Sequence, residues 1–204
     1  PSGNFGNIYS AYVLKKMGFP IKNLVIATNE NNILHRIIKN NDFSLYDVIK
    51  TNSPSMDITI SSNFERLLSE FLESSVLIDL YQKMPTRTHQ KSLDDSAHIA
   101  LSKNFVSMSA NSLEVEEQIQ NTFKDYNLLV DPHTAIGLIC AKKLKMSEVM
   151  CLACAHPVKF QDTVKKSLSK QIQYDKKFNF DHEEKFEVIS NNYLKLKEYI
   201  QNNA

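Results

Sequence analysis

The sequence predicts an α/β fold, an open and mostly parallel sheet flanked by helices. Apolar runs rich in branched side chains predict the strands, at residues 24–28, 105–108 and 149–154. Helical patterns separate these runs, and strands that alternate with helices are typical of a parallel sheet. With 204 residues, 42% of them hydrophobic, the chain can bury one substantial core. We therefore expect one domain over residues 1–204, with a helix-rich insertion over residues 75–127.

The first helix and strand follow from local patterns near the N-terminus. Residues 8–17 form a helical pattern with apolar side chains on nearly all of its faces, which predicts a buried helix. Gly18 and Pro20 end this helix. Residues 24–28 then form a short continuous apolar run, which is typical of a strand covered on both faces. A loop, a helix and a strand in this order make one turn of an α/β fold.

Later helices are predicted from capping residues and apolar periodicity. Ser62 and Glu65 have the spacing of a capping box, so a helix should begin there and continue to about Leu72. Asp131 and Pro132 are typical of a helix start, the Asp as the cap and the Pro at the first helical position. The remaining predictions are helices at residues 93–101, 113–126, 132–144 and 193–200, and a polar surface stretch at 159–177.

The segment from Ser2 to Asn7 is the strongest candidate for a binding site. Gly3 and Gly6 allow the backbone to turn tightly just before the first helix. Free peptide N–H groups and the helix dipole favour a phosphate at such a position, and the side chains of Ser2, Asn4 and Asn7 add neutral donors. The alternative is an ordinary turn before a buried helix, because the glycine spacing matches neither a Walker loop nor a dinucleotide-binding motif.

Composition excludes several classes of partner. The chain has 24 basic and 23 acidic side chains, a net charge of +1, so it has no general attraction for nucleic acid. No apolar stretch is long enough for a membrane span, and the N-terminus lacks the pattern of a signal peptide. An odd number of cysteines, three, suits a reducing compartment. We expect a cytoplasmic protein without a nucleic-acid or membrane partner.

Other polar residues allow two interpretations each. Cys151 and Cys154 have the spacing of a metal-binding pair, but no second pair exists and we expect no metal site. His133 is either a ligand contact or a helix-cap residue, and His156 either contacts a ligand or braces a loop. Arg66 either binds a phosphate-bearing substrate or forms a surface ion pair.

Several longer segments carry a family pattern. They are PSGNFGN at residues 1–7, ATNEN with LHR at 27–36, SPSMDI with SSNFERL at 53–67, DPHTAIG at 131–137 and AHPVKF at 155–160. In this order, and spread over most of the chain, they resemble threonine synthase of the bacterial and fungal type, a pyridoxal-phosphate (PLP) enzyme of fold type II. The resemblance implies the larger, tryptophan synthase β-like domain of that fold.

The resemblance also implies a cofactor site. The PLP phosphate would be held by the loop residues Gly3, Asn4, Phe5, Gly6 and Asn7. Cys154 would face the pyridine ring at a position where the family usually has threonine. A thiol is a weaker hydrogen-bond donor than a hydroxyl, which predicts a weaker tether to the ring nitrogen. Candidate contacts to the substrate are Arg66, His133 and His156.

For the intact protein, the resemblance implies conversion of O-phosphohomoserine and water to threonine and phosphate. In this family the lysine that forms the Schiff base lies upstream of the phosphate loop, whereas this chain begins at that loop with Pro1. Lys124 mimics the family's lysine motif but lies in a helical pattern, where a solvated side chain is expected. We therefore expect the C-terminal part of a longer chain, inactive alone and completed by an N-terminal domain. The alternatives are a PLP-dependent phospholyase and a non-catalytic relative that binds phosphometabolites.

Overall fold

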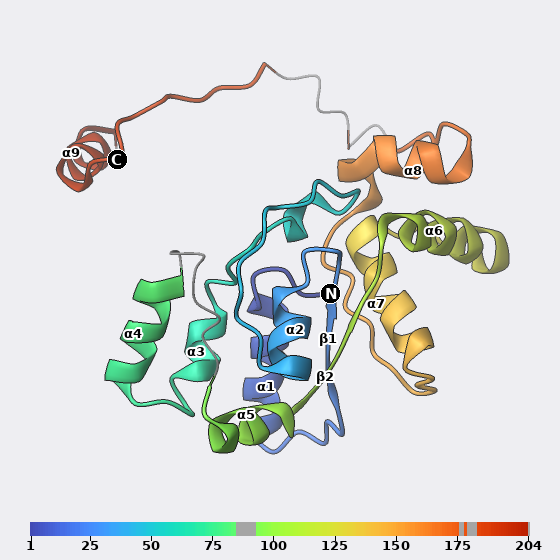
Figure 1. The fold of residues 1–204 in the computed structure, drawn as a ribbon. Coiled ribbons are helices and arrows are strands. Elements are labelled where there is room, and N and C mark those ends of the chain that lie inside the picture. Colours follow the sequence, from blue (N-terminus) through green and yellow to red (C-terminus); the bar gives the residue numbers. More distant parts are fainter. Residues whose placement is uncertain (85–92, 176–177, 179–182, 204) are drawn as a thin grey trace. The chain divides into compact units, whose positions relative to one another are not determined.

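The computed structural model describes residues 1–84, 93–175, 178 and 183–203 (Figure 1). The chain divides into two compact units, Pro1–Ile172 and Gln173–Ala204. The first unit contains the sheet and the predicted binding loop, so it carries the candidate site.

Two parallel strands form the sheet of the first unit. They are β1 (Leu24–Thr28) and β2 (Phe105–Ser109), and their register sets Leu24 opposite Phe105. Both strands were predicted from their continuous apolar runs, and both are confirmed. All residues of β1 except Val25 are buried, as expected for a strand covered on both faces.

Helices cover both faces of this sheet (Figure 1). On one face, Ile26 belongs to a core built with α1 (Gly6–Lys16) and α2 (Ile33–Asn40), and on the other, Ala27 belongs to a core built with α6 (Ser112–Tyr126) and α7 (Pro132–Lys143). This alternation follows from the pleat of the strand, which points successive side chains to opposite faces. The helical elements of this unit are α1 (Gly6–Lys16), α2 (Ile33–Asn40), η1 (Pro54–Met56), α3 (Phe64–Leu68), α4 (Ser74–Lys83), α5 (Asp95–Ser102), α6 (Ser112–Tyr126), α7 (Pro132–Lys143), η3 (Pro157–Phe160) and α8 (Gln161–Leu168).

The strand predicted at residues 149–154 is wrong. This segment is neither helix nor strand, and Val149 and Met150 are 42% and 88% exposed. Apolar composition favours a buried strand, but a strand also needs a neighbour that pairs with its backbone. Within the described residues, β1 and β2 pair only with each other. The segment therefore forms no strand.

Two predictions about helices near the site are also wrong. The capping box of Ser62 and Glu65 does not form, because α3 begins after Asn63 without a side-chain cap and ends at Leu68, short of the predicted Leu72. The first helix is not buried all round. Ile8 and Tyr12 are buried against the sheet core, while other apolar side chains of α1 face outward.

Patterns with strong capping residues were more reliable. Asn111 and Glu114 form a complete capping box at the start of α6, and Asp131 caps α7 as predicted. The predicted polar stretch at residues 159–177 contains α8, which buries Val164 and which the lysine-rich sequence concealed. The region 75–127, predicted as an insertion, holds α4, α5 and α6, and it also holds β2, half of the sheet.

The second unit contains α9 (Tyr193–Asn203), which was predicted at residues 193–200. Asn192 caps it by accepting the N–H groups of Leu194 and Lys195. No residue of α9 is buried.

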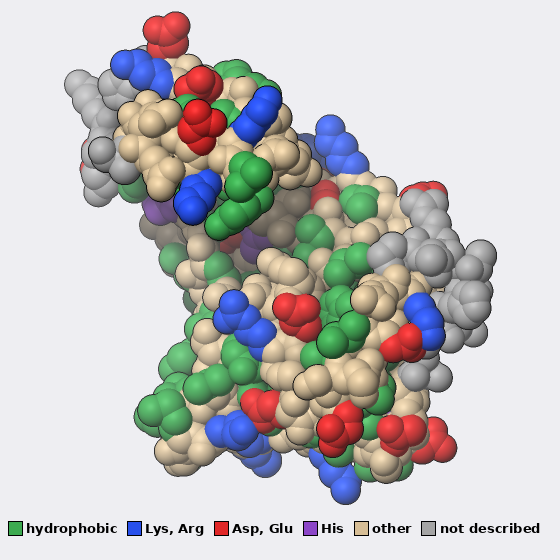
Figure 2. Space-filling view, turned by 90° about the vertical axis from the view of Figure 1, so that its left-hand side faces the viewer, with side chains coloured by type: hydrophobic (Ala, Val, Ile, Leu, Met, Phe, Trp, Pro, Cys, Tyr) green, Lys and Arg blue, Asp and Glu red, His purple; other side chains and the backbone are tan. Residues whose placement is uncertain are grey.

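Figure 2 shows hydrophobic side chains interspersed with charged ones on one face of the molecule. Among the described residues, no helix has the length and apolar character that crossing a membrane requires.

Candidate functional site

The loop before α1 is anchored to the carboxyl end of β1. The backbone N–H of Ser2 donates to the carbonyl oxygen of Ala27 at 2.7 Å, and the Ser2 side chain is buried. In open α/β sheets, ligands bind in the region outside the carboxyl ends of parallel strands. The loop thus lies where this class of fold places its ligands.

Gly3 is required by close packing against η1. A Cβ atom on Gly3 would lie 3.0 Å from Cα of Met56 and 3.1 Å from the carbonyl oxygen of Ser55. Only glycine allows the two backbones to approach this closely. The sequence predicted glycine here for a tight turn, and the structure gives a different reason for the same residue.

Phe5 turns the chain into α1 and is itself part of the core. Its φ angle is 65°, the left-handed region, and its side chain is 0% exposed. The ring packs edge-on against Phe64 and Phe105, with centroid distances of 5.0 Å and 5.9 Å. A left-handed residue other than glycine costs roughly 1–2 kcal/mol, which the burial of a phenylalanine ring offsets. Because the ring points into the core, only the backbone of Phe5 can face a ligand.

The backbone N–H groups from Gly3 to Ile8 have no acceptor among the described residues. The first hydrogen bond of the helical ladder runs from the N–H of Tyr9 to the carbonyl oxygen of Phe5, and α1 has no side-chain cap. Unsatisfied donors at a helix N-terminus, together with the positive end of the helix dipole, bind anions such as phosphate. The loop therefore has the donor set of an anion site.

Asn4 is held in place by the residues that precede α3. Its Oδ1 atom accepts the backbone N–H and the hydroxyl of Ser62, at 2.6 Å and 2.8 Å, and Asn63 donates to its carbonyl oxygen at 2.9 Å. Asn4 is exposed, and its amide nitrogen has no acceptor among the described residues. The contact between Asn4 and Ser62 also explains why Ser62 does not cap α3.

Asn7 and Cys154 lie in direct contact. Nδ2 of Asn7 donates to Sγ of Cys154 at 2.7 Å, although the residues are 147 positions apart. Both side chains are exposed. The sequence predicted that the two residues face one ligand, and the fold brings them together even though residues 149–154 form no strand.

His133 is a buried residue at the start of α7. Its Nδ1 atom is 2.9 Å from Oδ1 of Asp131, and its Nε2 atom accepts the N–H of Ser55 at 3.3 Å. Since Nε2 accepts, Nδ1 carries the proton and donates to Asp131. Burial opposes ionisation of Asp131, but hydrogen bonds from His133 and Thr134 outweigh it and hold the pKa of the carboxyl below its usual value. His133 therefore makes the hydrogen bonds of a helix-cap residue, the second of the two interpretations that the sequence allowed.

Arg66 and His156 lie on the surface. Arg66, on α3, is exposed and has no ion pair within the described ranges. Nδ1 of His156 accepts the N–H of Val158 at 3.2 Å, so this side chain caps η3 and braces the loop after residue 154. Lys124 is exposed on α6, as predicted.

A buried polar network next to the loop was missed in the sequence. Nδ2 of Asn29 contacts Thr51, Ser53 and Asp57 at 3.0, 3.0 and 2.8 Å, and Asn29 is 2% exposed. The network positions the η1 backbone against which Gly3 packs. The available signal was the set of polar residues within ATNEN and SPSMDI, segments that carried the family pattern.

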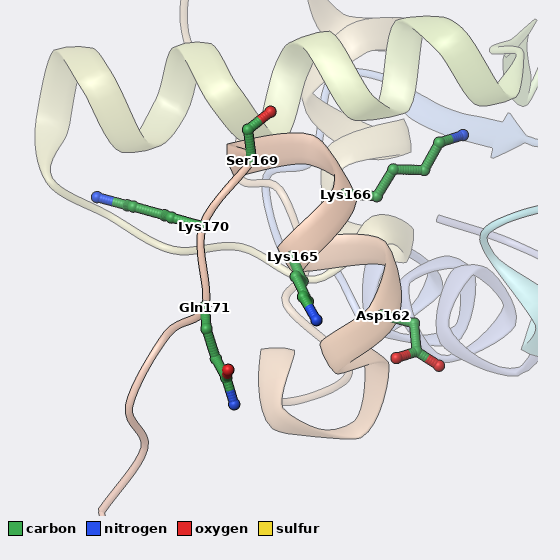
Figure 3. A pocket seen from close by; sticks show the side chains of 6 residues that line it. All are labelled: Asp162, Lys165, Lys166, Ser169, Lys170 and Gln171. Carbon is green, nitrogen blue, oxygen red and sulfur yellow. The ribbon is translucent and has the colours of Figure 1, made fainter.

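An open hollow lies elsewhere, at the C-terminal end of α8 (Figure 3). Its labelled side chains diverge instead of converging on one point. Lys166 is paired with Glu116 at 2.7 Å, and the Lys170 ammonium lies 4.4 Å from the centroid of the Phe123 ring. Its lining residues are Asp162, Lys165, Lys166, Ser169, Lys170 and Gln171, none of which was a predicted site residue. We assign no site there.

The fold and the loop define a class of protein. It is an α/β protein in which the backbone N–H groups at the N-terminus of α1 have no acceptor among the described residues, beside the carboxyl end of a parallel strand. Residues 134–200 match the family model described as threonine synthase, C-terminal.

Relatives of known name and structure cover most of the chain. The threonine synthases of Pseudomonas aeruginosa and Saccharomyces cerevisiae are 33% and 38% identical over 98% and 83% of it. A crystal structure of PLP-bound threonine synthase from Brucella melitensis is 35% identical and matches 99% of this chain with a TM-score of 0.84. The chain spans 44%, 37% and 45% of the respective lengths of these three proteins. It belongs to the threonine synthase family.

Proposed function

We propose that this chain forms the cofactor-phosphate site of a PLP-dependent threonine synthase, which converts O-phosphohomoserine and water to threonine and phosphate. The observation that carries the proposal is the row of backbone N–H groups from Gly3 to Ile8, which have no acceptor among the described residues. Family membership supports the same reaction, and the similar Brucella melitensis protein is PLP-bound.

The loop fits the phosphate of PLP in charge and in donor geometry. The backbone of Gly3, Asn4, Phe5, Gly6 and Asn7 supplies N–H donors, and the helix dipole of α1 favours the anion. The Asn4 amide is free to donate, and Asn7 presents its amide beside Cys154. Neutral donors suffice because a helix N-terminus binds phosphate without lysine or arginine.

When bound, PLP supplies an electron sink for the carbanion charge that develops on the substrate. The residues of this chain bind the cofactor and orient it. The loop fixes the phosphate end of the cofactor, and Cys154 offers its thiol to the ring end. The His133–Asp131 pair and the Asn29 network hold the η1 backbone in place behind Gly3.

Arg66 is the strongest of the substrate candidates in this proposal. Its guanidinium is exposed without a carboxylate partner among the described residues, and it lies one helical turn from Asn63, which contacts Asn4. A forked cation near the cofactor site suits a phosphate-bearing substrate. Both ring nitrogens of His133 are engaged, and His156 caps η3, so neither side chain has the freedom of Arg66.

The proposal also includes a lysine from outside these residues. The family relatives are more than twice as long, which supports an additional domain that carries the lysine bonded to the cofactor. On this proposal the 204-residue chain alone turns over no substrate, and the intracellular site of the enzyme is the cytoplasm.

Absorbance of the full-length protein before and after borohydride tests the cofactor assignment, because borohydride fixes a cofactor bonded to lysine. Incubation with O-phosphohomoserine then tests the reaction, and we expect threonine and phosphate. A keto acid in place of threonine would identify a phospholyase. Absence of a borohydride-sensitive absorbance would contradict the proposal and favour a non-catalytic relative.

A further inference from the structure

Cys151 and Cys154 lie on a segment that no regular structure holds. Residues 147–155 are neither helix nor strand, and no backbone–backbone hydrogen bond among the described residues involves them. The thiols of both residues are free. A segment without backbone hydrogen bonds can change its conformation at low cost.

Cys154 is the accessible member of this pair. Its side chain is exposed, and its Sγ atom accepts the hydrogen bond from Asn7 at the start of α1. A thiol at the surface reacts with small molecules, whereas a buried thiol is inert. Any covalent change at Cys154 therefore acts directly on the cofactor loop.

Cys151 is half-buried on the α7 side. Its Sγ atom lies 3.8 Å from the carbonyl oxygen of Thr134 and above Gly137, where an added Cβ would come within 2.4 Å of it. Burial raises the pKa of the Cys151 thiol, so this residue is poorly suited to react first with an external reagent. It is placed to act second, on a neighbouring sulfur atom.

We propose that Cys151 and Cys154 form a reversible disulfide that draws the Cys154 thiol away from Asn7 and weakens cofactor binding. The inference rests on the proposed function for its consequence, but the disulfide itself does not. A disulfide needs Cα atoms about 4.4–6.8 Å apart, and no backbone hydrogen bond of residues 147–155 among the described residues opposes the adjustment that reaches this separation. The Cys154 sulfur then bonds to Cys151 instead of lying against Asn7.

The oxidant we name is a low-molecular-weight disulfide such as oxidised glutathione. The Cys154 thiolate attacks one of its sulfur atoms, which forms a mixed disulfide and releases one glutathione thiolate. Cys151 then attacks the Cys154 sulfur, which forms the protein disulfide and releases the second glutathione. The two cysteine protons end on the two glutathione thiols. The two cysteines are oxidised and the glutathione disulfide is reduced, so atoms and electrons balance.

The test uses full-length protein without added cofactor, treated with dithiothreitol or with oxidised glutathione. Mass spectrometry of unreduced peptides should show that the peptide containing both cysteines loses two hydrogens. PLP affinity, measured by fluorescence titration, should fall about tenfold and return after dithiothreitol. Cys151→Ser should trap glutathione on Cys154, because the second step is then impossible.

Cys140→Ala is the matched control. Cys140 is fully buried, and burial raises the pKa of its thiol to about 12, so this variant should behave like the wild type in both measurements. Failure of the peptide to lose two hydrogens, or a mixed disulfide that persists in the wild type, would overturn the inference. So would equal PLP affinity of the reduced and oxidised proteins. A reduced protein that binds no PLP would instead contradict the proposed function.

Discussion

The first backbone N–H groups of α1 and of α7 differ in whether they have hydrogen-bond acceptors. At α7, the Asp131 carboxylate accepts the N–H groups of His133 and Thr134, so the helix start is satisfied internally. At α1, Phe5 holds the N-cap position without a side-chain cap, and the first N–H groups have no acceptor in the described part of the chain. Both helices pack against β1, but only α1 retains free donors.

On the proposed function, the difference separates a helix start that is satisfied within the protein from one that binds the cofactor phosphate. A buried carboxylate at α7 adds negative charge and occupies the donors, so an anion is excluded there. At α1 the donors are left for a ligand, and the cost of the left-handed Phe5 is offset by its aromatic packing in the core. Substitutions at the two helix starts should therefore affect different properties, stability at α7 and cofactor affinity at α1.

The largest expected effect is the loss of stability in Asp131→Ala. The substitution removes the cap of α7 and leaves the buried His133 without its acceptor, which together cost about 2–4 kcal/mol of unfolding free energy. Urea denaturation of the full-length protein measures it, with Asp131→Asn as the control that keeps a capping oxygen. Unchanged stability with lost PLP binding would mean that the α7 start is a ligand site.

Gly3→Ala should come next, with an effect on both stability and affinity. The new Cβ meets the backbone of η1 at 3.0 Å, so the loop must shift, at a cost of about 1–3 kcal/mol. Gly6→Ala is the matched control for stability, because the nearest atom to its Cβ is 4.0 Å away. Equal unfolding midpoints for the two variants would refute the packing role of Gly3.

Asn4→Ala and Asn7→Ala should each weaken PLP binding without a comparable loss of stability. Each removes a neutral hydrogen bond, of order 1 kcal/mol, which corresponds to about fivefold in the dissociation constant. Fluorescence titration of the full-length protein measures this change. If neither variant alters cofactor affinity, the assignment of the loop to the phosphate is wrong.

The smallest expected effect is that of Cys154→Thr. A hydroxyl donates a stronger hydrogen bond than a thiol and can still accept from Asn7, so PLP occupancy should be retained or improved. Absorbance of the purified protein at the cofactor band reports the occupancy. A clear loss of cofactor would show that the thiol itself has a role in the reduced protein.

Much of the fold was accessible from local sequence patterns. The apolar runs at 24–28 and 105–108 are strands, and the Asp-Pro start of α7 and the pattern of α6 predicted helices correctly. The sequence predictions were wrong where contacts with a distant segment decide the local structure. Residues 149–154 have a strand's composition without a neighbour, and Ser62 bonds to Asn4 instead of capping α3.

By itself, the sequence determined which residues are candidates for the site, because the glycines, asparagines and Cys154 are recognisable by type and order. Only the tertiary structure decided how these residues lie and what they contact. It placed Asn7 against Cys154 and packed Gly3 on the η1 backbone. It also engaged both ring nitrogens of His133 in hydrogen bonds at the helix cap. The physical reason is that hydrogen bonds and close contacts between distant segments form only when the fold packs the two segments together. The sequence of either segment alone therefore does not predict them.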